Sequence, residues 1–254
     1  MTTSQRNLFL ALLVVIAVVG VGAIFLITRP KGADAGNATS TGAAAGARGA
    51  EHDVTFSVGG QSQTVKGYEV KGDPTAGARF TLGQANAPVK VVEFANYQCY
   101  YCGQFEENTQ SAFLSRFVNS GVVHFFYRDF VIAEYPDAFK RAAAGAACAA
   151  DQNKFWEMHD ALYRVQTAWG PLTGGELDAQ LTDYASQLGL DTSKFSSCLS
   201  SGQYANAVMA DHNAGLGFGV NATPSFIING VLFEGAQPIE FFAAAIQAAQ
   251  NNWK

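Results

Sequence analysis

Residues 89–102 read VKVVEFANYQCYYC, and the architecture of the protein can be inferred outward from them. The first six residues are almost all apolar and rich in Val, which is typical of a strand buried on both faces of a sheet. Cys99 and Cys102 follow at a spacing of three. Apolar residues then recur on one broad face of a predicted helix that reaches about Val118, namely Phe105, Ala112, Phe113 and Phe117. A second buried-strand pattern, VVHFFYRDF at residues 122–130, completes an order of strand, Cys-x-x-Cys, helix and strand.

The position of the two cysteines at the start of a helix indicates their chemistry. The unpaired N–H groups and the partial positive charge of a helix N-terminus favour an anion. Since the thiolate is the reactive form of cysteine, this placement activates Cys99. The Tyr100 N–H or the Tyr101 hydroxyl is a further candidate donor to that thiolate. We therefore expect Cys99 to be the nucleophile and Cys102, one helical turn later, to be the resolving thiol.

A zinc site is the alternative explanation for a Cys-x-x-Cys pattern. Zinc normally requires a second pair of cysteines or histidines at similar spacing. Cys148 and Cys198 are solitary in the sequence, and no H-x₃₋₅-H pair occurs among the histidines His52, His124, His159 and His212. The spacing therefore favours a redox pair, and we predict neither a metal nor another cofactor.

The composition excludes two classes of protein. The 254 residues carry 16 basic and 21 acidic side chains, a formal net charge of −5, and 48% of them are hydrophobic. The chain is too apolar to be disordered and too acidic for a nucleic-acid binder that relies on a basic footprint. We expect no nucleic-acid partner.

The N-terminal segment at residues 8–28 contains 21 residues without a charge. As a helix it would be about 31 Å long, roughly the thickness of one hydrocarbon core. A cleaved signal peptide is the alternative, but its apolar region usually spans about 7–15 residues and a small-residue cleavage site follows closely. Here Arg29 and Lys31 follow directly, and the small residues at 43–45 lie well beyond. We interpret residues 1–28 as a short tail and an uncleaved transmembrane signal anchor.

The rest of the chain divides into a linker and one domain. Residues 29–52 are dominated by Gly, Ala and small polar residues, which cannot bury a core, so we predict a flexible linker. Residues 53–254 form the predicted domain. Its first element is a predicted hairpin, in which VTFSV and QSQTV flank Gly59 and Gly60.

Two segments of the sequence resemble a known family. EFANYQCYYC at residues 93–102, with Glu93 six residues before the first cysteine, resembles the active-site segment of the DsbA-like thiol:disulfide oxidoreductases of the thioredoxin superfamily. GVNATPSFIING at residues 219–230 resembles the family's loop in which a cis-proline precedes a strand, here Thr223-Pro224.

The resemblance extends from about Phe80 to Trp253. VLFEGAQ at residues 231–237 and the helix that begins at Pro238 resemble the family's last hairpin strand and C-terminal helix. Successive helical patterns at about 135–215 match its helical insertion. The resemblance therefore implies an α/β thioredoxin-like fold with a helical insertion.

Glu93 lies inside the predicted strand next to the thiols, where burial would raise its pKa and let it shuttle the proton of Cys102. A carboxylate at a solvated strand edge is the alternative. For Pro224 the family implies a cis peptide bond. A cis bond before Pro224 would leave the backbone of Thr223 facing Cys99, where it could pair with an extended substrate segment. The dipeptide between the cysteines departs from the Pro-His of the best-known oxidases, because Tyr101 carries no positive charge at neutral pH. Thr223 stands where some members have Val.

The two remaining cysteines, Cys148 and Cys198, lie in predicted helices 50 positions apart. Buried unpaired thiols are one interpretation, since free cysteine behaves as a small hydrophobe. Four cysteines in an exported domain, with two assigned to the redox pair, favour a structural disulfide between the other two.

These features predict an enzyme at the cell membrane. It would be a single-pass protein with its catalytic domain on the extracytoplasmic side, and it would transfer the Cys99–Cys102 disulfide to reduced exported proteins. The family implies a membrane oxidase that reoxidises it. A disulfide reductase or isomerase is the alternative within the enzyme class. A non-enzymatic, membrane-tethered thioredoxin-like binding module is the alternative outside it.

Overall fold

A computed structural model describes residues 49–131 and 136–253 of the protein. Within these two ranges no helix is both long and apolar enough to cross a membrane. The predicted anchor at residues 8–28 and most of the predicted linker lie outside the described residues.

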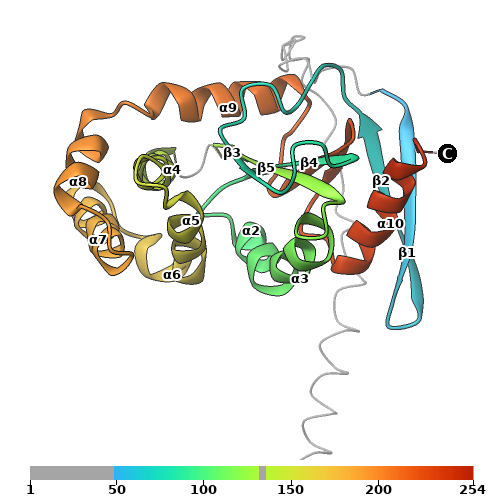
Figure 1. Cartoon of the computed structure of the whole chain (residues 1–254), viewed down its shortest axis with the longest axis horizontal. Helices are drawn as coiled ribbons and strands as arrows, with labels where there is room; N and C mark the ends of the chain where they lie inside the picture. The colour runs from blue at the N-terminus through green and yellow to red at the C-terminus, as the bar shows by residue number, and fades with distance from the viewer. Residues whose placement is uncertain (1–48, 132–135, 254) are drawn as a thin grey trace, which may run out of the picture. The chain divides into compact units, whose positions relative to one another are not determined.

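The described residues build a seven-stranded sheet with the order β1-β2-β7-β6-β4-β5-β3 (Figure 1). Only β4 and β5 pair in parallel, and every other neighbouring pair in this sheet is antiparallel. The strands are β1 (Glu51–Val58), β2 (Gln61–Glu69), β3 (Phe80–Leu82), β4 (Val89–Ala95), β5 (Val123–Asp129), β6 (Ser225–Ile228) and β7 (Val231–Glu234).

The predicted N-terminal hairpin is confirmed, and it extends the sheet at one edge. Gly59 and Gly60 adopt φ values of 58° and 79°, which a two-residue hairpin turn requires and which residues with a side chain rarely adopt. The turn aligns Val58 with Gln61, and the pairing continues back to Glu51. The strand therefore begins at Glu51, inside the segment predicted as linker, because its first two residues already pair with β2.

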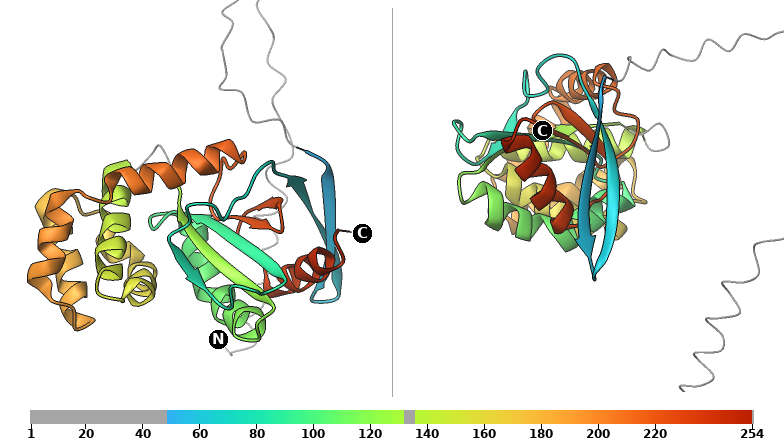
Figure 2. Two further views of the ribbon diagram at one scale, coloured as in Figure 1. Left: turned by 45° about the horizontal axis from the view of Figure 1, so that its top comes forward. Right: turned by 90° about the vertical axis from the view of Figure 1, so that its right-hand side faces the viewer.

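The central strands β4 and β5 confirm the two buried-strand predictions. They run in parallel register from Val89 opposite Val123 to Ala95 opposite Asp129. Along β4 every residue except Lys90 is buried. A strand can be apolar on both faces only when both faces are covered, and here helices lie on both sides of the sheet (Figures 1 and 2).

The helical segment after the cysteines ends at Val118, as predicted, but it contains two π-helical turns. It consists of α2 (Tyr100–Phe105), the π-helical turn η1 (Glu106–Gln110), α3 (Ser111–Phe113) and the π-helical turn η2 (Leu114–Val118). Phe105, Phe113 and Phe117 are buried, whereas Ala112 is exposed. The prediction for Ala112 was wrong because a π turn contains more residues than an α turn, which rotates the following residues around the axis.

The helical insertion follows β5 and packs beside the sheet (Figure 2). Its helices are α4 (Pro136–Ala150), α5 (Phe155–Arg164), α6 (Gln166–Trp169), α7 (Gly174–Gln187), α8 (Thr192–Ser201) and α9 (Ala205–Gly217). A single apolar cluster joins these helices to Tyr97, Cys102 and Tyr127 of the sheet region. The insertion therefore forms one wall of the region around the two thiols.

The C-terminal elements close the other side of the core. After β6 and β7, α10 (Ile239–Gln250) begins directly after Pro238, as the sequence predicts. Phe242 lies 4.9 Å from Phe226 and 5.1 Å from Phe113, measured between ring centroids. Truncating a buried Phe of this kind to Ala typically costs about 3–5 kcal/mol of stability.

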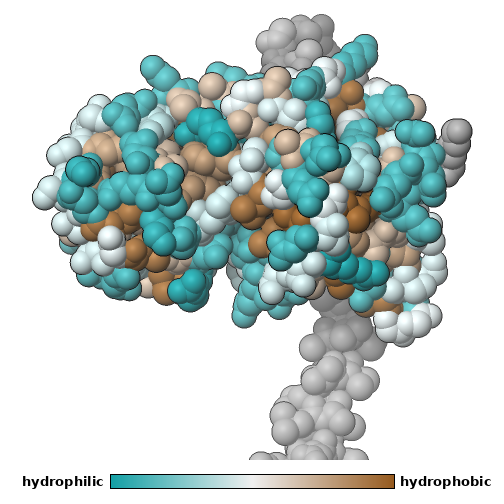
Figure 3. Space-filling view, in the orientation of Figure 1, coloured by the Kyte–Doolittle hydropathy of each residue, from teal (hydrophilic) through white to brown (hydrophobic). Residues whose placement is uncertain are grey.

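The surface drawn in Figure 3 is mostly hydrophilic, with hydrophobic residues in small patches between polar ones. Among the described residues, the large hydrophobic side chains that are exposed are Tyr100 at 65%, Tyr101 at 62% and Leu216 at 50%. Two of these three lie between the active-site cysteines, so the apolar surface next to the thiols is available to another molecule.

Candidate active site

Cys99 and Cys102 occupy the first turn of α2. Cys99 is the N-cap residue, with extended backbone angles of φ −74° and ψ 121°, and its side chain is half-buried. Cys102 is fully buried beneath it. Both are free thiols in this structure. The difference in exposure makes Cys99 the sulfur that a second molecule can reach.

The loop before β6 lies directly against Cys99. The Thr223–Pro224 peptide bond is cis, as the family resemblance implied. Ser225 pairs with Phe94 at the end of β4, so the loop before it is held beside the start of α2. The Cys99 thiol donates a hydrogen bond of 3.2 Å to the carbonyl oxygen of Thr223.

Hydrogen bonding lowers the pKa of the Cys99 thiol from 9.0 to about 6. The largest contribution comes from the Cys102 thiol, followed by Thr223 and by the backbone N–H groups of Cys102 and Tyr101, and partial burial opposes them. The Thr223 hydroxyl is buried and makes no other hydrogen bond among the described residues. The expected donors, the Tyr100 N–H and the Tyr101 hydroxyl, are not among these groups. The helix turn and the Thr223 loop stabilise the anion instead.

Burial raises the pKa of the Cys102 thiol well above its ordinary value. Hydrogen bonding to Cys99 and the charges of Cys99 and Glu93 act in the same direction. The Asn96 N–H, at 3.5 Å from the sulfur, partly opposes them. At neutral pH Cys102 is therefore protonated while Cys99 is mostly a thiolate.

Glu93 is a fully buried carboxyl group on β4, next to the thiols. Neither of its side-chain oxygens has a hydrogen-bond partner among the described residues. Burial raises its pKa well above the ordinary value, and the charges of Glu106 and Cys99 add to this effect. A protonated carboxyl at neutral pH can donate a proton and later take one back, which is the chemistry expected for Glu93.

Two polar side chains that the sequence analysis missed hold the cysteine loop in place. Gln166 Nε2 donates hydrogen bonds of 2.8 Å to the carbonyl oxygens of Tyr97 and Cys99. Asn96 accepts a 2.8 Å bond from the Gln98 N–H through its side-chain oxygen. The bonds from Gln166 span 69 and 67 sequence positions, and no local motif marks such a residue.

A second polar cluster lies where η1 faces α5. Glu106 Oε1 lies 3.2 Å from His159 Nε2. Burial lowers the pKa of His159 to about 4. Burial also raises the pKa of Glu106 well above its ordinary value, and the charge of Asp160 adds to this rise. A cavity of about 490 Å³ opens beside these residues, and it is also lined by Tyr100 and Gly103 of the active-site helix.

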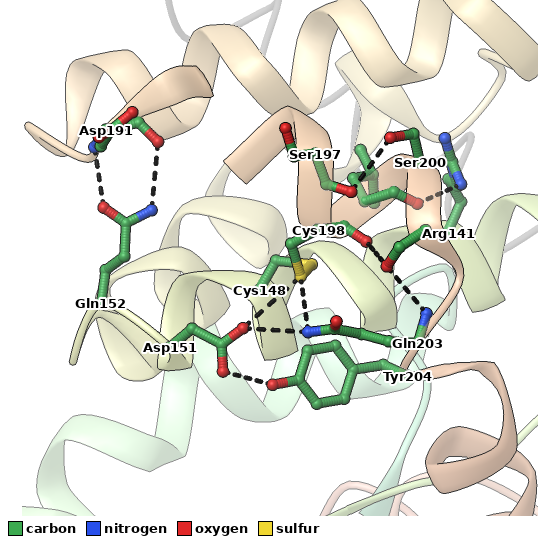
Figure 4. Close-up of a disulfide and its surroundings, with 12 residues drawn as sticks. Arg141, Cys148, Asp151, Gln152, Asp191, Ser197, Cys198, Ser200, Gln203 and Tyr204 are labelled. Atoms are coloured by element: carbon green, nitrogen blue, oxygen red, sulfur yellow. Dashed lines mark hydrogen bonds between the residues drawn. A yellow bond between two sulfur atoms is a disulfide. The ribbon is translucent and has the colours of Figure 1, made fainter. Parts of the chain in front are cut away.

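Cys148 and Cys198 form a disulfide between α4 and α8, with Cα atoms 5.8 Å apart (Figure 4). Cys148 is buried, and Cys198 is partly exposed. Asp151 accepts hydrogen bonds from the Tyr204 hydroxyl and from Gln203 Nε2 next to the bridge. The bond therefore ties two helices of the insertion together, beside a polar network that links the same helices to the start of α9.

Residues 75–248 match the sequence profile of a family described as Thioredoxin. The chain belongs to the thioredoxin family. This thioredoxin-family chain has a TM-score of 0.62 against the crystal structure of oxidised BdbD from Bacillus subtilis, at 23% identity. The alignment covers 72% of this chain and 98% of BdbD. The shared fold confirms the predicted thioredoxin-like architecture with a helical insertion.

Curated relatives of this thioredoxin-family chain fall into two groups. It is 34% identical over 167 residues to the Na(+)/H(+) antiporter NhaA 3 of Salinispora tropica, a match that covers 66% of this chain and 24% of the antiporter. It is 26% identical over 162 residues to Disulfide bond formation protein D of Bacillus subtilis, covering 63% of this chain and 72% of that protein. The chain thus spans about a quarter of the length of the antiporters and most of the length of the second relative.

Proposed function

We propose that the protein is a thiol:disulfide oxidoreductase that introduces disulfides into exported proteins through Cys99 and Cys102. The observation that carries this proposal is the state of Cys99: a half-buried sulfur at a helix N-terminus, with a pKa of about 6, beside the Thr223 carbonyl. A thiolate so stabilised is a good leaving group and makes the disulfide that contains it a stronger oxidant.

The first step of the reaction opens the enzyme disulfide. In the oxidised enzyme a substrate thiolate attacks Cys99 Sγ, forming a mixed disulfide while the Cys99–Cys102 bond breaks. The electron pair of that bond leaves on Cys102. Because burial disfavours the Cys102 thiolate, this sulfur takes a proton. Glu93 is buried, has a raised pKa and influences Cys102 electrostatically, so we assign it as the proton donor.

The second step releases the oxidised substrate. Another thiolate of the substrate attacks its own sulfur in the mixed disulfide, and Cys99 leaves as a stabilised thiolate. Two substrate thiols have then become one disulfide, and the enzyme disulfide has become two thiols. The main chain beside Thr223 lies at the reacting sulfur, where an extended substrate segment can pair with it. The exposed rings of Tyr100 and Tyr101 offer it apolar surface.

A further turnover requires reoxidation of the two thiols. We propose a membrane oxidase as that partner, as the resemblance to DsbA-like proteins implies. We also place the catalytic domain on the extracytoplasmic side of the cell membrane, held by residues 8–28 as a single-pass anchor. The second disulfide supports an oxidising compartment, because structural disulfides are rare in the cytoplasm.

The relatives support the chemistry in part. Disulfide bond formation protein D matches this chain over 72% of its own length. Disulfide bond formation is therefore the activity to test first. The match to the antiporters covers only 24% of the Salinispora tropica protein. We therefore propose no ion transport for this chain.

Equilibration of the active site with glutathione tests the direction of the reaction. A potential above the cytosolic glutathione poise, roughly −220 to −260 mV by extraction, is expected for an oxidase. A value near or below that of thioredoxin, about −270 mV, would make the protein a reductase. Oxidation of a reduced, unfolded substrate protein is the accompanying assay, and a non-enzymatic binding module would show no turnover in it.

A further inference from the structure

Three side chains of types that can bind a metal ion lie close together beside the cavity next to α2. Glu106, His159 and Asp160 each offer one ligand atom, and these atoms lie within 4.8 Å of one another. The separation of 3.2 Å between Glu106 Oε1 and His159 Nε2 is close to the value of about 3.3 Å for two tetrahedral ligands with bonds of about 2.0–2.1 Å to one ion. Asp160 is exposed, so its carboxylate can turn toward the other two.

The local backbone explains why these groups meet. Glu106 begins the π-helical turn η1, whose last residue, Gln110, also faces the imidazole: its Nε2 lies 3.3 Å from His159 Nε2. Turns of this kind are rare and are frequent at functional sites. His159 and Asp160 are consecutive on α5, so their side chains point about 100° apart. One is therefore buried, and the other lies at the rim of the cavity.

The imidazole is oriented as a metal ligand usually is. His159 Nδ1 makes a 3.2 Å hydrogen bond with the Tyr97 hydroxyl. Metal-ligating histidines almost always use their second ring nitrogen in such a bond, which fixes the ring and the tautomer. Nε2 is left facing the carboxyl of Glu106 and the side-chain amide of Gln110.

The cavity supplies an entry path and room for water ligands. Its volume is about 490 Å³, and Glu106 and Asp160 both line it. Glu107 adds a third carboxylate to the lining, and Arg164 is the cationic side chain there. The wall is therefore net acidic, which favours the approach of a cation.

We propose that Glu106, His159 and Asp160 form a binding site for a divalent transition-metal ion, with water from the cavity completing the coordination. Two carboxylate oxygens and one imidazole nitrogen suit Zn²⁺ and its neighbours better than Mg²⁺ or Ca²⁺, which prefer oxygen ligands alone. The site goes beyond the proposed exchange activity, because it needs neither Cys99 nor Cys102.

Zn²⁺ titration of the oxidised protein, followed by calorimetry, tests the proposal. Oxidation of Cys99 and Cys102 removes the two thiols that would otherwise bind zinc themselves. We expect one ion per chain, with affinity reduced at least about tenfold by Asp160→Asn and by Glu106→Gln. Co²⁺ as a spectroscopic probe should give an absorption spectrum typical of nitrogen and oxygen ligands, without a thiolate-to-cobalt band.

Glu107→Gln is the matched control, because it removes the same charge from the neighbouring residue of the same cavity wall. It should retain the affinity of the wild type. Absence of Zn²⁺ binding to the oxidised protein overturns the proposal, and so does an equal loss in Glu107→Gln and Asp160→Asn, which indicates diffuse attraction. Asp160 is exposed, so its variant is expected to fold and decides the outcome even if Glu106→Gln does not fold.

Discussion

The thiol of Cys99 lies 3.2 Å from the carbonyl oxygen of Thr223, although 124 positions separate the two residues in the sequence. This contact joins the reactive sulfur to the loop that precedes β6. Thr223 also carries a buried hydroxyl that makes no other hydrogen bond among the described residues and lowers the pKa of Cys99. One residue therefore offers a main-chain surface to a substrate and a hydrogen bond to the thiolate.

The two active-site thiols should divide the reaction between them. Cys99→Ser should abolish thiol–disulfide exchange, because the buried Cys102 cannot be reached by substrate. Cys102→Ser should leave a reactive Cys99 whose mixed disulfides accumulate, since no resolving thiol remains. Mass spectrometry of the adducts measures this. Faster alkylation of Cys102 than of Cys99 by iodoacetamide at mildly acidic pH would reverse the assignment.

Thr223→Val should raise the pKa of Cys99 and make the protein a weaker oxidant. The substitution keeps the shape of the side chain but removes the hydroxyl that bonds to the thiolate. A hydrogen bond to a charged group is worth about 1.5–3 kcal/mol, so a rise of about one pKa unit or more is expected. Thiolate absorbance as a function of pH measures the pKa, and the glutathione equilibrium measures the potential. An unchanged pKa would show that the Thr223 hydroxyl makes no bond to the anion.

The lowered pKa of Cys99 makes the stability of the reduced protein depend on pH. The folded-state pKa of about 6 lies below the ordinary value of 9.0, so ionisation of Cys99 stabilises the folded state fully above pH 9. That contribution is lost as the pH falls from 9 to 6. Denaturant unfolding should therefore show the reduced form gaining stability relative to the oxidised form as the pH rises through this window. The Cys99→Ser variant, which cannot form the disulfide, should lack this gain in stability between pH 6 and pH 9. Persistence of the gain in the variant would assign it to another group.

Glu93→Gln should stabilise the protein above neutral pH and slow the protonation of Cys102. The pKa of Glu93 is raised in the folded state, so its carboxyl costs stability once the unfolded chain ionises, and the cost disappears below the ordinary pKa of 4.5. We expect a gain in the free energy of unfolding at pH 8 and none at pH 4. Urea unfolding at both pH values measures it, with the exposed Glu107→Gln as the control. A variant less stable than wild type at pH 8 would contradict this account.

Replacing Cys148 and Cys198 by Ala should lower stability without affecting exchange. The bridge closes a loop of 50 positions, worth roughly 4 kcal/mol on the chain-entropy model. Thermal unfolding and the exchange assay measure the two effects. Mass mapping of alkylated protein should find this bridge intact after mild reductant opens Cys99–Cys102. Free thiols at both positions in oxidised protein would contradict the prediction.

Much of the fold could be inferred from local patterns. The two buried strands and the N-terminal hairpin follow from hydrophobic periodicity and turn residues, because these signals lie within a few consecutive residues. The C-terminal helix from Pro238 was implied by the family resemblance. The redox pair follows in the same way, since Cys99 and Cys102 occupy one helical turn. Periodicity failed at Ala112, where a π turn shifts the face of the helix without a local sequence signal.

The chemical state of the site depended on contacts between distant segments. Burial is the largest cause that raises the pKa of Glu93, and burial exists only once the helical insertion and α10 cover the sheet. Gln166, His159 and Thr223 contact Cys99 or the loop before α2 across at least 62 positions. Neighbouring residues in the sequence determine local secondary-structure preferences. The burial of a side chain and hydrogen bonds from distant segments arise only in the folded tertiary structure. The sequence could therefore name the two thiols, while the three-dimensional structure set which of them ionises.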